Sequence, residues 1–138
     1  MERIDFQVNE EDRKDIVKRT YKFATRILYI VNKLPSNVLT YRIIDQLIGC
    51  GTAIGSNAEE ASVGFSKSDF PYKMSIASKE ARETNYFLRL LRDSGLIKEN
   101  SLFKEIVDAI DESNQIKKIL TAVVKTSQAK KEPKKFGS

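Results

Sequence analysis

The chain has 138 residues, 41% of them hydrophobic and 31% charged, which is the balance of one globular domain rather than of a disordered chain. Three prolines and six glycines favour long helices over strands and turns, and no apolar run approaches the roughly 20 residues that cross a membrane. The net charge is +5, histidine is absent, and Cys50 is the only cysteine, so histidine-based catalysis and an internal disulfide are both excluded.

The first two expected helices cover about residues 9–33 and 38–62. Asn9 is a favourable N-cap for the first, and Pro35 breaks the chain between them because the residue before a proline is pushed out of the helical region. Apolar side chains recur at helical spacing in both segments. The two stripes are Ile16, Thr20, Phe23, Ile27, Ile30 and Leu34, and then Ile43, Leu47, Cys50, Ile54, Ala58 and Ala61.

The third and fourth expected helices cover about residues 69–93 and 101–125. Ser68 caps the third, and the Ser94-Gly95 step ends it. The fourth continues into a basic, flexible tail at residues 127–138. The third carries a heptad seam of about three repeats, formed by Phe70, Met74, Ala77, Ala81, Thr84, Leu88 and Leu91, and the apolar stripe of the fourth is Phe103, Ile106, Ile110, Ile116, Leu120 and Val123.

Four helices of matched length joined by short loops predict an all-α, antiparallel up-down-up-down four-helix bundle that forms one domain at residues 1–126. Some apolar stripes are wider than the arc of about 100° that a monomeric bundle buries. Ordinary variation of the core is one explanation. A homo-oligomer interface or a docked protein partner is the other, and its candidate residues are Tyr21, Leu28, Ile76, Phe87 and Leu90.

Positive charge is concentrated at the C-terminus, where residues 117–138 hold seven lysines against one acid and carry a net charge of +6. Residues 1–116 sum to −1. The outer face of the third helix also interleaves cations with an aromatic ring, a pattern that can bind phosphates and stack a base. A solvated helix face and a solubilising tail are the alternatives. The nucleic-acid candidates are Lys79, Arg82, Tyr86 and Arg89 on the helix, and Lys125, Lys130, Lys131, Lys134 and Lys135 in the tail.

A glycine pattern, G-x-G-x-x-x-G, occupies residues 49–55. No strand precedes it and no Gly-Lys-Ser/Thr step follows, so close helix packing is favoured over a phosphate loop. Asn57 is expected to hydrogen-bond to a neighbouring helix or subunit. Four carboxylates, those of Glu59, Glu60, Glu80 and Glu83, point in different directions as helical residues. We therefore expect no metal site, no cofactor and no catalytic group.

Three ordered segments carry a family resemblance: CGTAIGSNAEEA at residues 50–61, SKSDF at 66–70 and IASKEARET at 76–84. The chain resembles the bacterial four-helix-bundle proteins that include those encoded in 23S ribosomal RNA intervening sequences. The match covers residues 40–97 and departs from the family pattern at Ala53, where serine is usual, and at Pro71. The pattern takes in Gly51, Gly55, Asn57, Glu60, Glu80 and Glu83.

The resemblance implies a bundle that forms ring-like homopentamers without enzyme activity. Distant fold relatives, the accessory proteins of diversity-generating retroelements, oligomerise and engage nucleic acid. Those relatives are basic across the body, whereas residues 1–116 here are not. The first hypothesis is therefore a non-enzymatic cytoplasmic homo-oligomer whose lysine tails bind RNA or DNA. The alternative is a protein-binding adaptor that uses an apolar helix flank and has no nucleic-acid role.

Overall fold

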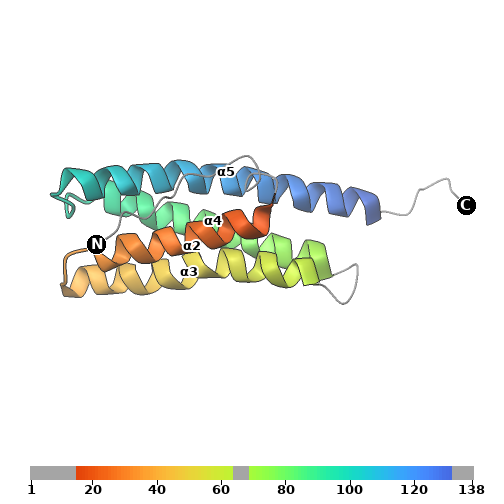
Figure 1. Cartoon of the computed structure of the whole chain (residues 1–138), viewed down its shortest axis with the longest axis horizontal. Coiled ribbons are helices and arrows are strands. Elements are labelled where there is room, and N and C mark those ends of the chain that lie inside the picture. The colour runs from red at the N-terminus through yellow and green to blue at the C-terminus, as the bar shows by residue number, and fades with distance from the viewer. Residues whose placement is uncertain (1–14, 64–68, 132–138) are drawn as a thin grey trace, which may run out of the picture.

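The computed structural model describes residues 15–63 and 69–131, which form four α-helices and no strand. The helices are α2 (Ile16–Asn32), α3 (Val38–Val63), α4 (Asp69–Asp93) and α5 (Asn100–Lys131). Each helix runs back along the helix that precedes it in the chain (Figure 1). The backbones of α2 and α3, α3 and α4, α4 and α5, and α5 and α2 lie next to each other, while those of the diagonal pairs lie further apart. The predicted all-α, up-down bundle is confirmed.

The first helix starts later than the sequence predicted. Asp15 has an extended backbone, and its Oδ1 accepts hydrogen bonds from the amide nitrogens of Val17 at 3.0 Å and Lys18 at 3.3 Å. An aspartate that accepts from the second and third helical amides is a strong N-cap. The expected helix at 9–33 is therefore corrected to Ile16–Asn32. The expected cap, Asn9, lies outside the described residues.

The last helix ends later than predicted. It continues to Lys131, so the flexible tail expected at 127–138 is wrong for its first five residues. The segment after Val124, KTSQAKK, holds three lysines, one alanine and one glutamine, which are favourable in helices, and the next proline is Pro133. As a result, the C-terminal part of α5 extends past the other three helices (Figure 1).

The core lies between the four helices and uses the predicted stripes. From Met74 to Leu91, every residue of the predicted seam of α4 is buried. Burying such a side chain contributes about 1.5–3 kcal/mol, so the seams together provide the main force that holds the bundle. The largest fully buried apolar side chains are Phe23, Ile27, Ile30, Leu47, Ile54, Met74, Leu88, Leu91, Ile106, Ile116 and Leu120.

Two glycines allow α2 to approach α3 closely. A Cβ added at Gly51 would lie 2.9 Å from Cγ2 of Ile27, and one at Gly55 would lie 3.3 Å from the carbonyl oxygen of Thr20. Both positions are within α3. The close approach agrees with the packing interpretation of the glycine pattern, and a position inside a helix is incompatible with a phosphate-binding loop.

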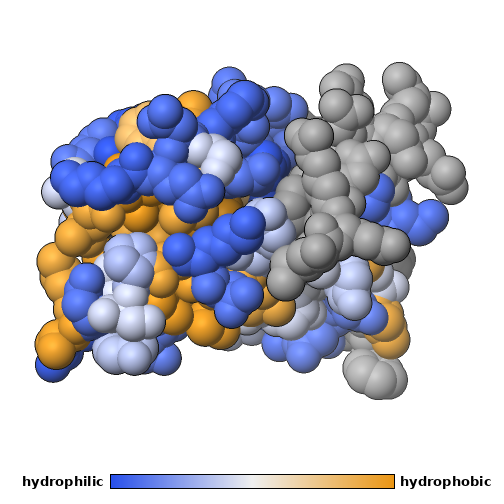
Figure 2. Space-filling view, turned by 60° about the vertical axis from the view of Figure 1, so that its left-hand side comes forward, coloured by the Kyte–Doolittle hydropathy of each residue, from blue (hydrophilic) through white to orange (hydrophobic). Residues whose placement is uncertain are grey.

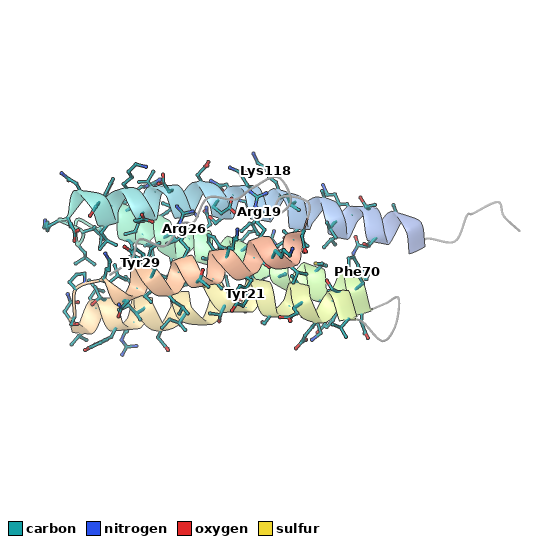
Figure 3. All side chains as sticks on the ribbon, viewed as in Figure 1. Arg19, Tyr21, Arg26, Tyr29, Phe70 and Lys118 are labelled. Carbon is teal, nitrogen blue, oxygen red and sulfur yellow. The ribbon has the colours of Figure 1, made fainter. Side chains whose placement is uncertain are left out.

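The contact between α2 and α5 is polar, which the sequence analysis did not anticipate. The Arg19 guanidinium donates to both carboxylate oxygens of Glu112, at 2.9 and 2.7 Å, and also to Oε1 of Gln115 at 2.9 Å. Arg19 and Glu112 are 4% and 8% exposed, and the hydrogen bond that Arg19 donates to Glu112 raises the pKa of Arg19. Arg26 makes longer ion pairs two turns away, at 4.0 Å to Glu105 and 3.9 Å to Asp108. Both arginines point from α2 toward α5 (Figure 3).

Candidate nucleic-acid interface

An open groove runs between α4 and α5 and has a volume of about 420 Å³. Four of its six lining residues are cations, and none is acidic. Arg82 comes from α4, whereas the other lining residues come from α5. They are Lys117, Lys118, Thr121, Ala122 and Lys125.

Two polar contacts fix the register of α4 against α5 and so place the groove. The hydroxyls of Ser78 and Thr121 lie 3.3 Å apart. One turn beyond Arg82, the amide Nδ2 of Asn85 donates to Oγ of Ser113 at 2.9 Å and to Oδ1 of Asn114 at 3.1 Å. The helices α4 and α5 are antiparallel. The part of α4 between Ser78 and Asn85 therefore faces the part of α5 between Ser113 and Thr121. Arg82 therefore lies opposite the first two lysines of the groove.

The cations of the groove can attract an anion. Like charges held side by side repel one another, and a negatively charged ligand between them relieves that repulsion. Walls formed by the two helices also reduce the screening that water provides on a flat surface. A polyphosphate backbone, which presents a negative charge at each unit, is the ligand that best suits a row of cations.

The predicted nucleic-acid residues fall into three groups. Arg82 and Lys125 line the groove, as described above. Lys79, Tyr86 and Arg89 are exposed on the adjoining surface of α4. The backbones of Lys130 and Lys131 continue α5 beyond the groove, and Lys134 and Lys135 lie outside the described residues. The structure thus brings two of the predicted residues into one groove and places three others beside it.

Lys117 and Lys118 were counted in the basic C-terminal segment but were not predicted as ligand residues. Their spacing could have predicted a shared site, because Lys118 and Lys125 are two turns apart and therefore lie on the same face of a helix. What the sequence did not reveal is that this face of α5 lies against Arg82. The position of Arg82 depends on the register of α4 against α5, which the residue pattern of one helix does not contain.

The candidate oligomer residues lie on two different faces. Tyr21 and Leu28 are 67% and 46% exposed on α2, and Tyr21 lies at the junction with α3 (Figure 3). On α4, Leu90 is 41% exposed, whereas Ile76 and Phe87 are half-buried and Phe87 packs against the core. Figure 2 shows a broad hydrophobic area at the bundle end that carries the α2–α3 connection. Exposed large apolar side chains lie on both α2 and α3, and those of α3 include Val38, Leu39, Tyr41 and Ile48.

A family model, described as 23S rRNA-intervening sequence protein, matches residues 12–122. The chain belongs to this family. The crystal structure of a protein of unknown function from the S23 ribosomal protein family of Bacteroides thetaiotaomicron VPI-5482 is similar to this bundle, with a TM-score of 0.70 and 30% sequence identity. The similarity covers 82% of this chain and 97% of that one. Among proteins with curated functions, none matches this sequence significantly.

Two of the segments that carry the family resemblance, residues 50–61 and 76–84, lie in α3 and α4. Nδ2 of Asn57 donates at 2.8 Å to the carbonyl oxygen of Ala53 in its own helix and not to a neighbouring helix. The hydrogen bond to a neighbouring subunit, the other alternative, stays a prediction. Glu60 reaches across to α4, where its carboxylate lies 2.8 Å from Nζ of Lys73. This exposed ion pair connects α3 to α4 at the surface.

Glu80 and Cys50 also lie at the contact between α3 and α4. Partial burial, followed by the charge of Glu83, raises the pKa of the Glu80 carboxyl. Burial likewise raises the pKa of the Cys50 thiol, which is 5% exposed and therefore behaves as a small apolar residue. Within residues 15–63 and 69–131, no group of cysteine, aspartate and glutamate side chains is arranged to hold a metal ion. None of the four helices is long and apolar enough to cross a membrane.

Proposed function

We propose that this protein is a non-enzymatic, nucleic-acid-binding bundle whose binding surface is the groove between α4 and α5. One observation carries the proposal: four cations and no acid line a groove between two helices whose register is fixed by polar contacts. The sequence hypothesis relied on the C-terminal lysines. The groove adds cations on a rigid surface, where fewer side-chain degrees of freedom must be lost on binding.

The lysines that follow the groove in the sequence add further cations in this proposal. Lys130 and Lys131 continue along α5, and Lys134 and Lys135 follow them in the sequence. A polyanion held in the groove would pass toward this end of α5. Contacts to phosphate are independent of base sequence, so the protein is expected to bind many sequences with similar affinity. Because the single cysteine is a buried thiol, a reducing cytoplasm suits the protein.

The test compares two variants that remove the same amount of charge. The groove variant carries Arg82→Gln, Lys117→Gln and Lys118→Gln, and the off-groove variant carries Arg42→Gln, Lys98→Gln and Lys104→Gln. We expect the groove variant to bind a labelled single-stranded RNA on the order of 50-fold more weakly at low salt, since three charged contacts are lost. The off-groove variant should bind within about twofold of the unaltered protein, as measured by fluorescence anisotropy.

Two results would contradict the proposal. If both variants lose the same affinity, net charge and not the groove determines binding. If the unaltered protein does not bind RNA or DNA, the groove has another role. A chain truncated after Lys125 separates the tail from the groove, and we expect it to retain most of the affinity.

We also propose that the protein forms a homo-oligomer through the exposed apolar surface of α2 and α3. Large apolar side chains such as Leu39 and Ile48, which are 57% and 39% exposed, are candidates for burial against a second copy. The groove lies on the other pair of helices, so assembly through α2 and α3 leaves it open. A ring would hold several grooves and tails together, and binding one polyanion at several sites increases affinity. If the protein is instead a monomer, the adaptor alternative is favoured, because the apolar surface is then free for a different protein.

A further inference from the structure

An aromatic residue and an arginine lie beside the groove in a fixed arrangement. Tyr86 is one turn beyond Arg82 on α4 and is 51% exposed. The guanidinium carbon of Arg89 lies over its ring, 5.8 Å from the centroid. The edge of the ring also packs against Phe87, with the two centroids 5.4 Å apart. The ring is therefore held in place and still exposes part of its surface.

Arg89 is hydrogen-bonded to Asn85, the residue that joins α4 to α5. Nε of Arg89 donates at 2.8 Å to Oδ1 of Asn85, whose amide nitrogen is bound to Ser113 and Asn114 of α5. Asn85 is 5% exposed, so this chain of hydrogen bonds is anchored in the α4–α5 contact. The pKa of Asp93 is lowered, first by its hydrogen bond from Arg92 and also by the charge of Arg89. Tyr86 is thus a half-exposed aromatic ring, contacted by Arg89 and Phe87, one turn beyond the groove residue Arg82.

Several cations follow the Tyr86–Arg89 pair along α5. Asn114 marks the level of this pair on α5, and Lys125 lies eleven residues further along. Eleven residues of helix span about 17 Å at about 1.5 Å per residue. A stacked strand has a phosphate about every 3.4 Å, so the cations are spread over the length of several successive phosphates.

We propose that the groove selects single-stranded nucleic acid, with its phosphates along the α4–α5 cations and one base stacked on Tyr86 beside Arg89. The inference rests on the proposed nucleic-acid function and adds the class of ligand. Stacking on an aromatic ring requires a base whose face is uncovered, and in a duplex the neighbouring base pairs cover both faces. Arg89 contributes a cation to the same stacked base. The Tyr86 ring is the selective element, and the groove cations supply affinity without selectivity.

The test uses the full-length protein and one labelled RNA strand of about 15 nucleotides, free of self-complementarity, either alone or annealed to its complement. We expect the single strand to bind about tenfold more tightly than the duplex. Tyr86→Leu should weaken single-strand binding about tenfold, which is the loss of one stacked base, and leave duplex binding unchanged. Tyr86→Phe keeps the ring and should bind as the unaltered protein does. Tyr72→Leu is the matched control, since Tyr72 is also an exposed tyrosine of α4.

The outcomes separate this inference from the proposed function. If Tyr86→Leu leaves single-strand binding unchanged, or if the duplex binds as tightly as the single strand, the inference is overturned. The proposed function still stands in that case, provided that the groove variant binds more weakly than the off-groove variant. If the unaltered protein binds neither form of RNA, both proposals fail. Circular dichroism confirms that each variant remains helical.

Discussion

Glu112→Ala should lower the free energy of unfolding by about 3–5 kcal/mol, the largest loss that we expect from one substitution outside the apolar core. The carboxylate of Glu112 accepts two hydrogen bonds from Arg19, and both side chains are buried. Removing the carboxylate leaves the guanidinium without its main partner in a site that water reaches poorly. The loss of stability comes mainly from the buried, unpaired charge of Arg19. It is therefore larger than the stability that the intact Arg19–Glu112 pair contributes.

Urea unfolding followed by circular dichroism measures this effect, and an exposed ion pair provides the control. Lys104 and Asp108 form a pair at 3.0 Å on the surface of α5, and Lys104→Ala should cost less than about 0.5 kcal/mol. The double variant Arg19→Met/Glu112→Leu should be more stable than Glu112→Ala alone, because it removes both charges. A loss of less than 1 kcal/mol for Glu112→Ala would show that the pair does not hold α2 against α5.

Leu28→Asp should convert the oligomer into a monomer. Leu28 is 46% exposed on α2, in the surface that we propose is buried between copies. An unpaired carboxylate in an interface loses its hydration, at a cost of several kcal/mol for each copy. Because every copy in a symmetric assembly carries the substitution, the cost is repeated at each contact. The free monomer keeps the aspartate in water and should remain folded.

Light scattering coupled to size-exclusion chromatography gives the mass of each form. Leu90→Asp is the matched control, because Leu90 is 41% exposed but lies on α4. We expect the mass of Leu90→Asp to equal that of the unaltered protein. If Leu90→Asp dissociates and Leu28→Asp does not, the interface is on the flank of α4. If the unaltered protein is already a monomer, the proposed self-association is contradicted.

The fold could be predicted because helix burial is periodic along the sequence. Met74, Ala77, Ala81, Leu88 and Leu91 share one side of a helix at that spacing, and all five are buried. The ends of the helices were harder to predict, because several residues compete to cap a helix. Asp15 acts as the N-cap of α2 although Asn9 offered the same chemistry earlier in the chain.

The site could be predicted only in part because it is formed by two helices. Arg82 and Lys125 were identified from charge on each helix, but the groove depends on which face of α5 meets α4. That register is set by Asn85 with Ser113, a pair 28 residues apart in the sequence. The burial of Arg19 could not be predicted for the same reason. An arginine at the edge of an apolar stripe is expected to be exposed, and its buried partner Glu112 lies on a different helix.

The central claim is that cations of the α4–α5 groove neutralise nucleic-acid phosphates, and a salt titration tests it most directly. The logarithm of the binding constant for single-stranded RNA should fall linearly with the logarithm of the salt concentration, with about 0.7 added to the slope by each neutralised phosphate. Removing the three charges of the groove variant should therefore reduce the slope by about 2, whereas the off-groove variant should keep the slope of the unaltered protein. Equal slopes for all three proteins would show that the groove does not contact phosphate.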